Sequence, residues 1–348
     1  MVQRIKIGEK WVGKGEPTFI IADAGFNHQG DIRIAKKLID IATKAGADSV
    51  KFRRCHALSI LTKEGYEKEY DNPISFGSTY GKHREALELN EVEFAEIKEY
   101  SESKGLIFLA SPWDVVSADF LETLNISAYK IASADINNIP FLEHVARKKR
   151  PMIVSTGMSD MKDVQTAYDL VTRFTDQLVI MQCTASYPCD FDEINLNVLL
   201  TYQKLFDCPI GYSGHEKGIA IPIAAVAMGA SVIERRFTID RTMKGSDHAA
   251  SLEPDSLEKL VSDIRSTEKA FGSAEKTKQK SEIPVEKKLK KSLTSAKPIM
   301  EGTRITAEHL TSKIPGTGIP PSDIQKLIGK VANRNIDADK ILQWEYFN

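Results

Sequence analysis

Basic and hydroxyl-bearing side chains directly follow several short apolar runs of this 348-residue chain. Four of them are cations: Lys51, Arg53, Lys130 and Arg236. Ammonium and guanidinium groups are common protein partners of phosphate and carboxylate. The accompanying hydroxyl residues at the ends of other runs are Ser133, Ser155, Thr184 and Ser213. If the runs meet in the fold, these residues predict a pocket for a small anion that carries both phosphate and carboxylate.

Other residues with useful chemistry stand at the same kind of position. Asp23 and Asn27 follow the first apolar run, and His215 follows a later one. The loop Gly245–Glu253 comes after the last run and contains Asp247. Each residue alone could belong to an ordinary surface loop, and the loop could simply cap the next helix. Eight polar run ends in one chain favour a shared site instead.

The apolar runs alternate with amphipathic stretches, as strands and helices do in a parallel sheet that is covered on both faces. The β-rich runs are Thr18–Asp23, Ser49–Arg53, Ile107–Ala110, Ala128–Ile131, Met152–Ser155, Leu178–Gln182, Pro209–Ser213 and Val232–Phe237. The helical stretches are Ile32–Ala45, Glu91–Lys104, Val115–Leu124, Ile139–Lys148, Met161–Phe174, Leu196–Leu205, Ile219–Met228 and Ser256–Phe271. This pattern predicts an α/β fold, a (β/α)8 TIM barrel, whose ligands bind at the carboxyl ends of the strands.

An open doubly wound sheet is the rival interpretation of the same alternation. A dinucleotide-binding version would place GxGxxG after the first strand, and a P-loop version would contain GxxxxGK[ST]. The sequence has no GxGxxG at that position and no GxxxxGK[ST] motif. We therefore expect a barrel that uses no nucleotide cofactor.

Two segments interrupt the repeating pattern. Cys55–Asn90 is too long for a plain connection, and we expect a functional loop at the barrel mouth. Residues 272–285 are rich in Lys, Glu and Ser, which is typical of a linker. The chain is thus predicted to contain a barrel domain, residues 1–271, and a small module, residues 286–348. The limited core of that module would gain from packing on another surface.

Composition excludes several other classes of protein. Lys and Arg number 47 and Asp and Glu number 48, and this net charge of −1 does not suit a nucleic-acid binder. No apolar run approaches the roughly 20 residues that span a bilayer, so we expect no membrane segment. The start of the chain lacks a secretory signal core. The four cysteines form no CxxC pair, which indicates reduced thiols in the cytoplasm.

Six segments of the barrel domain resemble the sialic acid synthase family and occur in the family's order. They are Ala22–Asp31 (ADAGFNHQGD), Val50–Phe52 (VKF), Phe76–His83 (FGSTYGKH), Gln182–Pro188 (QCTASYP), Pro209–His215 (PIGYSGH) and Lys244–Pro254 (KGSDHAASLEP). In the module, Pro315–Ile319 (PGTGI) and Ile328–Lys330 (IGK) resemble the family's antifreeze-like SAF domain. The resemblance covers nearly the whole chain.

This resemblance implies a TIM barrel that condenses phosphoenolpyruvate with an N-acylmannosamine or a related aldose. The products would be a nine-carbon 2-keto-3-deoxy sugar acid and phosphate. The resemblance also implies a domain-swapped homodimer, in which the SAF domain of one chain covers the barrel mouth of the other. Phosphoenolpyruvate is a multiply charged anion of the kind that the predicted cationic pocket suits.

The resemblance also implies roles for individual residues. Phosphoenolpyruvate would be held by Lys51, Lys130, Ser133, Ser155, Thr184 and Ser213. The aldose would face Asn27, Arg53, Asp135, Tyr187 and Asp247. Catalysis would depend on Asp23, His215 and Arg236 together with the two lysines. His215 would be one of two histidine ligands of a divalent metal, Mn²⁺ or Mg²⁺.

Four positions depart from the residues that the family usually has. Asp23 stands in place of a glutamate that is tied to catalysis and the sugar, and Arg53 in place of a glutamine. Arg236 stands in place of the second metal-binding histidine. Ile314 stands in place of an arginine that reaches the acyl group of the sugar. The half of the site that binds phosphoenolpyruvate is therefore better preserved than the half that binds the sugar.

The strand that contains Arg236 leads to a prediction about the metal. Because side chains alternate along a strand, Glu234 and Arg236 should share one face and Arg235 should take the other. A guanidinium has no lone pair to offer a metal ion, and its charge repels one. We predict a weak or absent metal site, with Arg236 either acting as a fixed cation toward the substrates or turned out to solvent.

Two other functions remain open at this point. A catalytically impaired homologue that binds an anionic sugar or a partner protein would fit the four departures. A Schiff-base aldolase would use Lys51 or Lys130 as its nucleophile, which requires a desolvated, uncharged lysine. Two lysines among other cations more simply indicate a clamp for phosphate.

Overall fold

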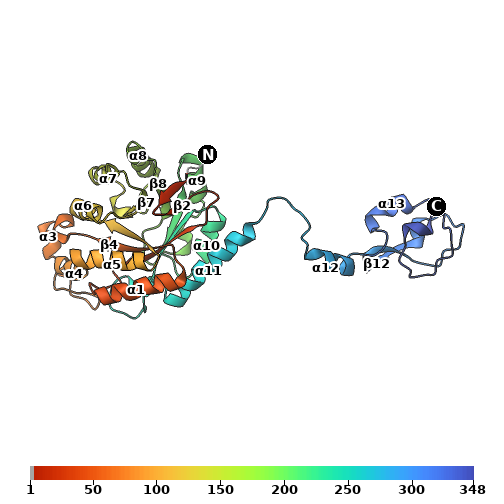
Figure 1. The fold of residues 1–348 in the computed structure, drawn as a ribbon, viewed down its shortest axis with the longest axis horizontal. Coiled ribbons are helices and arrows are strands. Elements are labelled where there is room, and N and C mark those ends of the chain that lie inside the picture. Colours follow the sequence, from red (N-terminus) through yellow and green to blue (C-terminus); the bar gives the residue numbers. More distant parts are fainter. Residues whose placement is uncertain (1–3) are drawn as a thin grey trace. The chain divides into compact units, whose positions relative to one another are not determined.

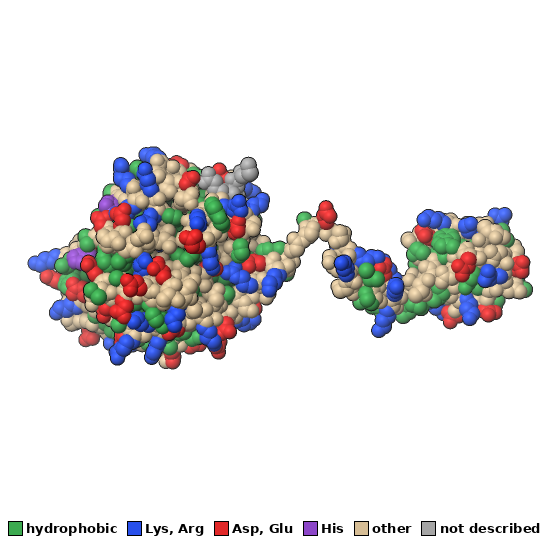
Figure 2. Space-filling model, in the orientation of Figure 1, with side chains coloured by type: hydrophobic (Ala, Val, Ile, Leu, Met, Phe, Trp, Pro, Cys, Tyr) green, Lys and Arg blue, Asp and Glu red, His purple; other side chains and the backbone are tan. Residues whose placement is uncertain are grey.

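The computed structural model describes residues 4–348 and divides the chain into two compact units. The first unit ends at Gly272 and the second begins at Ser273. Acidic and basic side chains are interspersed over the face that Figure 2 shows, in keeping with the net charge of −1. Among the residues that the structure describes, no helix is both long enough and apolar enough to cross a membrane.

The first unit is a closed barrel of eight parallel strands with helices around it (Figure 1). In order around the barrel the strands are β3 (Phe19–Gly25), β4 (Ser49–Arg54), β5 (Ile107–Pro112), β6 (Tyr129–Ile131), β7 (Met152–Ser155), β8 (Leu178–Cys183), β9 (Ile210–Gly214) and β10 (Val232–Arg236). Strand β10 pairs with β3 and closes the barrel. The predicted TIM barrel is therefore confirmed.

Eight helices pack outside the strands, and each follows a strand of the barrel in the chain. They are α1 (Ile32–Ala45), α5 (Glu91–Ser103), α6 (Val115–Thr123), α7 (Ile139–Ala146), α8 (Met161–Val171), α9 (Val198–Leu205), α10 (Ala220–Ala227) and α11 (Pro254–Phe271). Helix α1 illustrates why they form: Asp31 caps its first turn, and Gly46 ends it with a left-handed φ of 76°. Its buried residues include Leu38 and Ile39, which face the outer side of the sheet.

The interior of the barrel is apolar at the amino ends of its strands. Phe19 and Ile21 of β3 belong to this inner core, whereas Ile20 and Ala22 pack outward against the helices. A hairpin of β1 (Ile5–Ile7) and β2 (Lys10–Val12) adds three buried side chains, Ile5, Ile7 and Val12, to the inner core. The hairpin therefore closes the amino end of the barrel.

The segment between β4 and α5 is more ordered than a plain loop. It contains α2 (Ala57–Ile60), α3 (Lys63–Glu67) and α4 (Tyr80–Ala86). Close packing holds α4 in place, because a Cβ atom on Gly30 would lie 2.3 Å from the carbonyl oxygen of Ala86. The left-handed φ of Gly30, 72°, likewise suits glycine. The segment thus presents fixed side chains beside the strand ends.

The second unit has a small core of its own. It contains α12 (Glu282–Leu289), strands β11 (Ser292–Ser295) and β12 (Leu310–Lys313), and α13 (Ile324–Leu327). Its buried core is formed by Leu293, Ile299, Ile305, Ile319, Leu327, Ala332, Ile336, Leu342 and Phe347. Helix α12 begins at Glu282, so the last residues of the predicted linker are helical.

Candidate active site

Because side chains alternate between the two faces of each strand, a layer of charged side chains lies inside the barrel next to the apolar layer, on its carboxyl-end side. In β3 the inward side chains run from Phe19 through Ile21 to Asp23, and in β10 they run from Val232 to Glu234. The register aligns these polar residues across neighbouring strands, with Asp23 opposite Lys51 and Glu234 opposite Ser213. The strand sequences therefore bring the predicted cations together at the carboxyl end of the barrel.

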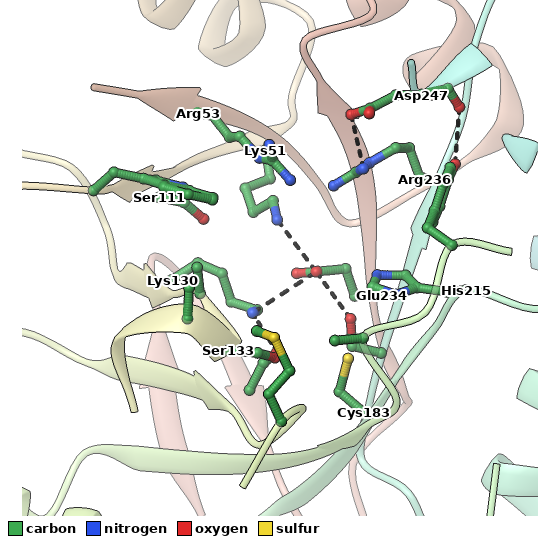
Figure 3. Close-up of a pocket in the computed structure, with 18 of the residues that line it drawn as sticks. Lys51, Arg53, Ser111, Lys130, Ser133, Cys183, His215, Glu234, Arg236 and Asp247 are labelled. Carbon is green, nitrogen blue, oxygen red and sulfur yellow. Dashed lines mark hydrogen bonds and ion pairs between the residues drawn. The ribbon is translucent and has the colours of Figure 1, made fainter. Parts of the chain in front are cut away.

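Glu234 lies at the centre of this layer (Figure 3). One of its carboxylate oxygens lies 3.2 Å from Nζ of Lys51 and 3.8 Å from Nζ of Lys130, and it accepts a 3.1 Å hydrogen bond from Ser213. Nζ of Lys130 donates to Ser155 over 2.5 Å. The second carboxylate oxygen of Glu234 is buried and has no hydrogen-bond partner among the described residues.

Burial and charge act in opposite directions on these groups. Burial favours the neutral form of Glu234, but Lys130 and Lys51 together lower the pKa of this carboxyl. Burial lowers the pKa of Lys130, which is 2% exposed, while Glu234 opposes that shift. The carboxylate therefore stabilises the two ammonium groups in a place where water cannot.

Arg236 lies between two aspartates on the neighbouring side of the layer. Its Nη2 lies 3.0 Å from Asp23, and its Nη1 donates to Asp247 over 2.7 Å. Burial would lower the pKa of Arg236, but Asp247 and Asp23 raise it above its ordinary value. The guanidinium is 9% exposed, so the structure excludes the alternative in which it turns out to solvent. Arg235 points to the other face and pairs with Glu216, as the alternation predicts.

A glycine makes the close approach around Arg236 possible. Gly25 ends β3 with a left-handed φ of 53°. A Cβ atom at this position would lie 3.0 Å from Nε of Arg236 and 3.2 Å from a carboxylate oxygen of Asp247. Two cations act on Asp23 here: burial would raise the pKa of this carboxyl, but Lys51 and Arg236 hold it well below its ordinary value.

A cavity of about 380 Å³ lies above the charged layer. Ten residues predicted for the site line it: Lys51, Arg53, Lys130, Ser133, Ser155, Tyr187, Ser213, His215, Arg236 and Asp247. Tyr187 donates to the backbone oxygen of Asp247 over 2.9 Å and lies beneath the Arg236 guanidinium. This side of the cavity is therefore held by contacts between β10, its following loop and the loop after β8.

The other four predicted residues lie outside the cavity lining. Asp23 contacts Lys51 and Arg236 from below. Asn27 is buried and donates to the backbone oxygen of Phe237 and to Ser251. Thr184 donates to the backbone oxygen of Glu193, and Asp135 lines a neighbouring cavity. Their roles in binding phosphoenolpyruvate or the aldose stay predictions.

Several lining residues have no predicted role. Glu234 is the most central of them, and Ser111, Trp113, Cys183 and Ser246 complete the wall. Except for Ser246, which lies in the loop after β10, each stands at or near a strand end, so position along the chain was the available signal. Burial raises the pKa of the Cys183 thiol, which keeps this cysteine protonated and unreactive.

The residues around His215 do not fit a divalent metal. Burial, followed by the charge of Arg236, lowers the pKa of His215 to about 4, and its Nδ1 is buried without a partner. Asp23 and Asp247 already neutralise Arg236. Within residues 4–348, no group of three or more His, Cys, Asp or Glu side chains is arranged to hold a metal ion. One neutral imidazole beside a guanidinium is too small a donor set for Mn²⁺ or Mg²⁺.

Fold and site together define a class: a TIM barrel with a cation-lined pocket for a small anion at its mouth. Residues 38–276 match the NeuB family, and residues 290–347 match the SAF domain. The chain therefore belongs to the NeuB family and carries a C-terminal SAF domain.

Similar proteins with assigned names agree with this family assignment. The chain is 43% identical to human N-acetylneuraminate-9-phosphate synthase over 97% of this chain and 94% of the human protein. It is 39% identical to N,N'-diacetyllegionaminic acid synthase of Legionella pneumophila over 97% of each chain. The crystal structure of N-acetylneuraminic acid synthetase from Leptospira borgpetersenii aligns with a TM-score of 0.72 at 34% identity, covering 82% of this chain and 95% of that one.

Proposed function

We propose that this protein condenses phosphoenolpyruvate with an N-acylmannosamine or a related aldose and releases phosphate. The observation that carries the proposal is the buried group of Lys51, Lys130 and Glu234 at the floor of a polar cavity. Its chemistry suits the phosphate and carboxylate of phosphoenolpyruvate. Two relatives are an N-acetylneuraminate-9-phosphate synthase and an N,N'-diacetyllegionaminic acid synthase, which agrees with this choice of substrates.

Phosphoenolpyruvate binds at the bottom of the cavity in this proposal. The ammonium groups of Lys51 and Lys130 neutralise its negative charges, and hydroxyl groups of Ser133, Ser155 and Ser213 donate to its oxygens. The aldose binds above it, toward Tyr187 and Asp247. Arg236 then lies between the two substrates as a cation that polarises the aldehyde oxygen.

The reaction forms one C–C bond and breaks one C–O bond. Carbon 3 of phosphoenolpyruvate attacks the aldehyde carbon of the open-chain aldose, and water adds at carbon 2. The tetrahedral intermediate breaks its bond to the phosphate oxygen, which leaves a ketone and free phosphate. The two protons of the water end on the new hydroxyl group and on the phosphate. In this proposal His215, which a lowered pKa of about 4 keeps neutral at pH 7, accepts a proton from this water and passes it on.

The Schiff-base alternative requires a neutral lysine. The carboxylate of Glu234 lies 3.2 Å from Nζ of Lys51 and 3.8 Å from Nζ of Lys130, which is the arrangement of ion pairs rather than of a free amine nucleophile. We therefore expect that borohydride reduction in the presence of pyruvate leaves the mass of the protein unchanged. A mass increase that maps to Lys51 or Lys130 would favour the aldolase instead.

Phosphate release tests the proposed function directly. Purified protein is mixed with phosphoenolpyruvate and a panel of N-acylmannosamines, with and without their 6-phosphates, and phosphate is measured over time. The proposal expects phosphate release that depends on the aldose and matches the amount of sugar acid formed. An impaired homologue would bind phosphoenolpyruvate in calorimetry but release no phosphate with any aldose.

The assembly and location of the enzyme belong to the same proposal. We expect a homodimer in which the SAF domain of one chain covers the barrel mouth of its partner. Helix α12 supports an apolar contact of this kind, because Ile283, Val285 and Leu289 are exposed on it. All four cysteines are free, which suits the reducing cytoplasm.

A further inference from the structure

Two arginines stack on the same pair of aromatic rings beside the active site. The guanidinium carbon of Arg53 lies 4.8 Å from the ring centroid of Phe26 and 4.9 Å from that of Trp113. The corresponding distances for Arg84 are 4.7 Å and 5.1 Å. Arg53 comes from the end of β4, whereas Arg84 comes from α4. Two positive charges from separate segments are thus held next to each other.

Neither of these guanidinium groups forms an ion pair with a carboxylate of residues 4–348. Two neighbouring arginines do: Arg54 lies 3.8 Å from Glu88, and Arg236 contacts both Asp23 and Asp247. Arg84 is 7% exposed, and its Nε is buried without a hydrogen-bond partner among the described residues. Its polar contact within the protein is a 3.5 Å hydrogen bond from Nη2 to the Cys55 sulfur.

A buried cation such as Arg84 beside a half-buried one such as Arg53 is unfavourable unless an anion joins them. Stacking on Phe26 and Trp113 offsets part of the cost but neutralises neither charge. Burial and the nearby charge of Arg236 lower the pKa of Arg53, yet a guanidinium keeps its proton at neutral pH. The missing negative charge therefore has to come from a bound molecule.

The position of the two arginines indicates which part of the site the bound anion occupies. Arg53 lines the cavity above the charged layer, and Arg84 lines a second cavity of about 650 Å³. The two cavities share Trp113 and Ala134 in their walls. The side chain of Trp113 also has an unpartnered Nε1 donor in this region. A ligand that extends from the first cavity into the second would pass both guanidinium groups.

We propose that Arg53 and Arg84 bind a phosphate monoester on the aldose, at the end remote from its aldehyde. Two adjacent cations suit a group that carries nearly two negative charges at neutral pH, whereas a hydroxyl group would leave both uncompensated. This inference rests on the proposed function, in which the aldehyde end lies by Arg236. It makes the second substrate an aldose phosphate and the product a sugar acid phosphate.

Substrate selectivity tests the proposal. The kcat/KM values for N-acetylmannosamine and N-acetylmannosamine 6-phosphate are compared at saturating phosphoenolpyruvate. We expect the wild-type protein to favour the phosphate ester by about 100-fold, the scale of two charge-assisted contacts. Arg84→Gln and Arg53→Gln should each reduce this ratio by about tenfold or more. Arg84→Lys should retain more of the ratio than Arg84→Gln because it keeps the charge.

A matched control and a second measurement keep the outcome clear. Arg147→Gln removes an exposed arginine from the end of α7 and should leave the ratio unchanged. Should Arg84→Gln not fold, Arg53→Gln and the wild-type ratio decide the question. Equal kcat/KM values for the two sugars, or an unchanged ratio in both glutamine variants, would overturn the proposal.

Binding measurements separate this proposal from the proposed reaction. With phosphoenolpyruvate present, calorimetry should show that N-acetylmannosamine 6-phosphate binds more tightly than N-acetylmannosamine, and that inorganic phosphate weakens its binding. If no aldose gives turnover but this preference remains and falls in Arg84→Gln, the reaction is wrong and the anion site stands. If both sugars turn over without a preference, the reaction stands and the anion site is wrong.

Discussion

Glu234 has a function that its strand position alone does not reveal. Its carboxylate is shared by Lys51, Lys130 and Ser213. Because these partners also face the proposed phosphoenolpyruvate site, Glu234 holds both lysine side chains in the orientation that the substrate needs. The residue acts through the lysines and is in this sense a positioning residue.

Lys130 should contribute strongly to phosphoenolpyruvate binding. The Lys130→Ala variant loses a buried charge-assisted contact, which costs about 2–4 kcal/mol. We expect calorimetry to show phosphoenolpyruvate binding weakened by a factor of about 30 or more. Lys148→Ala, which removes a lysine that pairs with Asp119 and Glu122 outside the barrel, is the control and should bind normally. Equal binding by both variants would contradict the assignment.

Arg236 should make the enzyme independent of metal. The guanidinium uses Asp23 and Asp247 as its partners, and these carboxylates are then not free to hold a cation. We expect a chelator to leave turnover unchanged and mass spectrometry of the native protein to find no stoichiometric Mn²⁺. Arg236→His should create a site with His215 and introduce a response to Mn²⁺. Activity that a chelator abolishes and Mn²⁺ restores in the wild type would contradict this prediction.

At the scale of elements, the turn after β3 lies beside the site and also contributes to the stability of the barrel. His28 in this turn is 2% exposed and lies near the rings of Phe26 and Phe52, with its Nδ1 accepting from the backbone N–H of Gly30 over 3.2 Å. Its Nε2 has no hydrogen-bond partner among the described residues. Burial lowers the pKa of His28 to about 4, so the folded protein holds the ring neutral at pH 7.

Stability should therefore fall as the pH drops from about 6.5 toward 4. In this window the unfolded chain binds a proton at His28 and the folded protein does not, which favours unfolding. A pKa shift from 6.5 to about 4 corresponds to about 3 kcal/mol across the window. Urea unfolding of His28→Gln at several pH values should give a smaller slope than the wild type. The surface variant His144→Gln should keep the wild-type slope, and equal slopes for all three proteins would contradict the prediction.

The eight barrel strands were predictable because their residues are mostly buried and most of the strands contain a short apolar run between amphipathic helical stretches. The β1–β2 hairpin was not, since each of its strands has only three residues and its tight turn contains only Gly8 and Glu9. The alternation in β10 correctly separated Arg235 from Glu234 and Arg236.

Some contacts of the site join residues that are far apart in the sequence, so no local sequence pattern predicts them. The stacking of Arg84 on Trp113 joins residues 29 positions apart, and the pairing of Arg236 with Asp23 joins residues 213 apart. Arg84 lies in a segment that was expected only as a functional loop, because its three short helices have weak signals. The sequence indicated which strand ends meet, but the partner of each side chain depends on the closed barrel.

At the scale of the whole molecule, the chain joins an enzyme barrel to a small unit that has its own core. The segment from Gly272 to Ser281 is exposed throughout and links the two. A short linker and the exposed apolar residues on α12 suit a unit that packs on another surface, which supports the proposed dimer.

Light scattering should give the mass of two chains for the 348-residue protein at micromolar concentration. If the C-terminal unit holds the dimer together, a chain that ends at Gly272 should give the mass of one truncated chain rather than two. Substitution of Leu289 by Glu should weaken dimerisation, whereas substitution of Leu205, which is exposed at the end of α9 away from the barrel mouth, by Glu is the control. A monomeric 348-residue protein would contradict the proposed assembly.

The hairpin at the amino end of the barrel determines the end through which substrates can enter. Because Ile5, Ile7 and Val12 close that end, phosphoenolpyruvate and the aldose enter through the carboxyl-end mouth. The groups proposed for phosphoenolpyruvate lie deepest, with Lys130 and Ser155 almost fully buried. An aldose that arrived first would block the way down. Initial-rate kinetics should therefore show an ordered sequence, with phosphoenolpyruvate binding first and the aldose second.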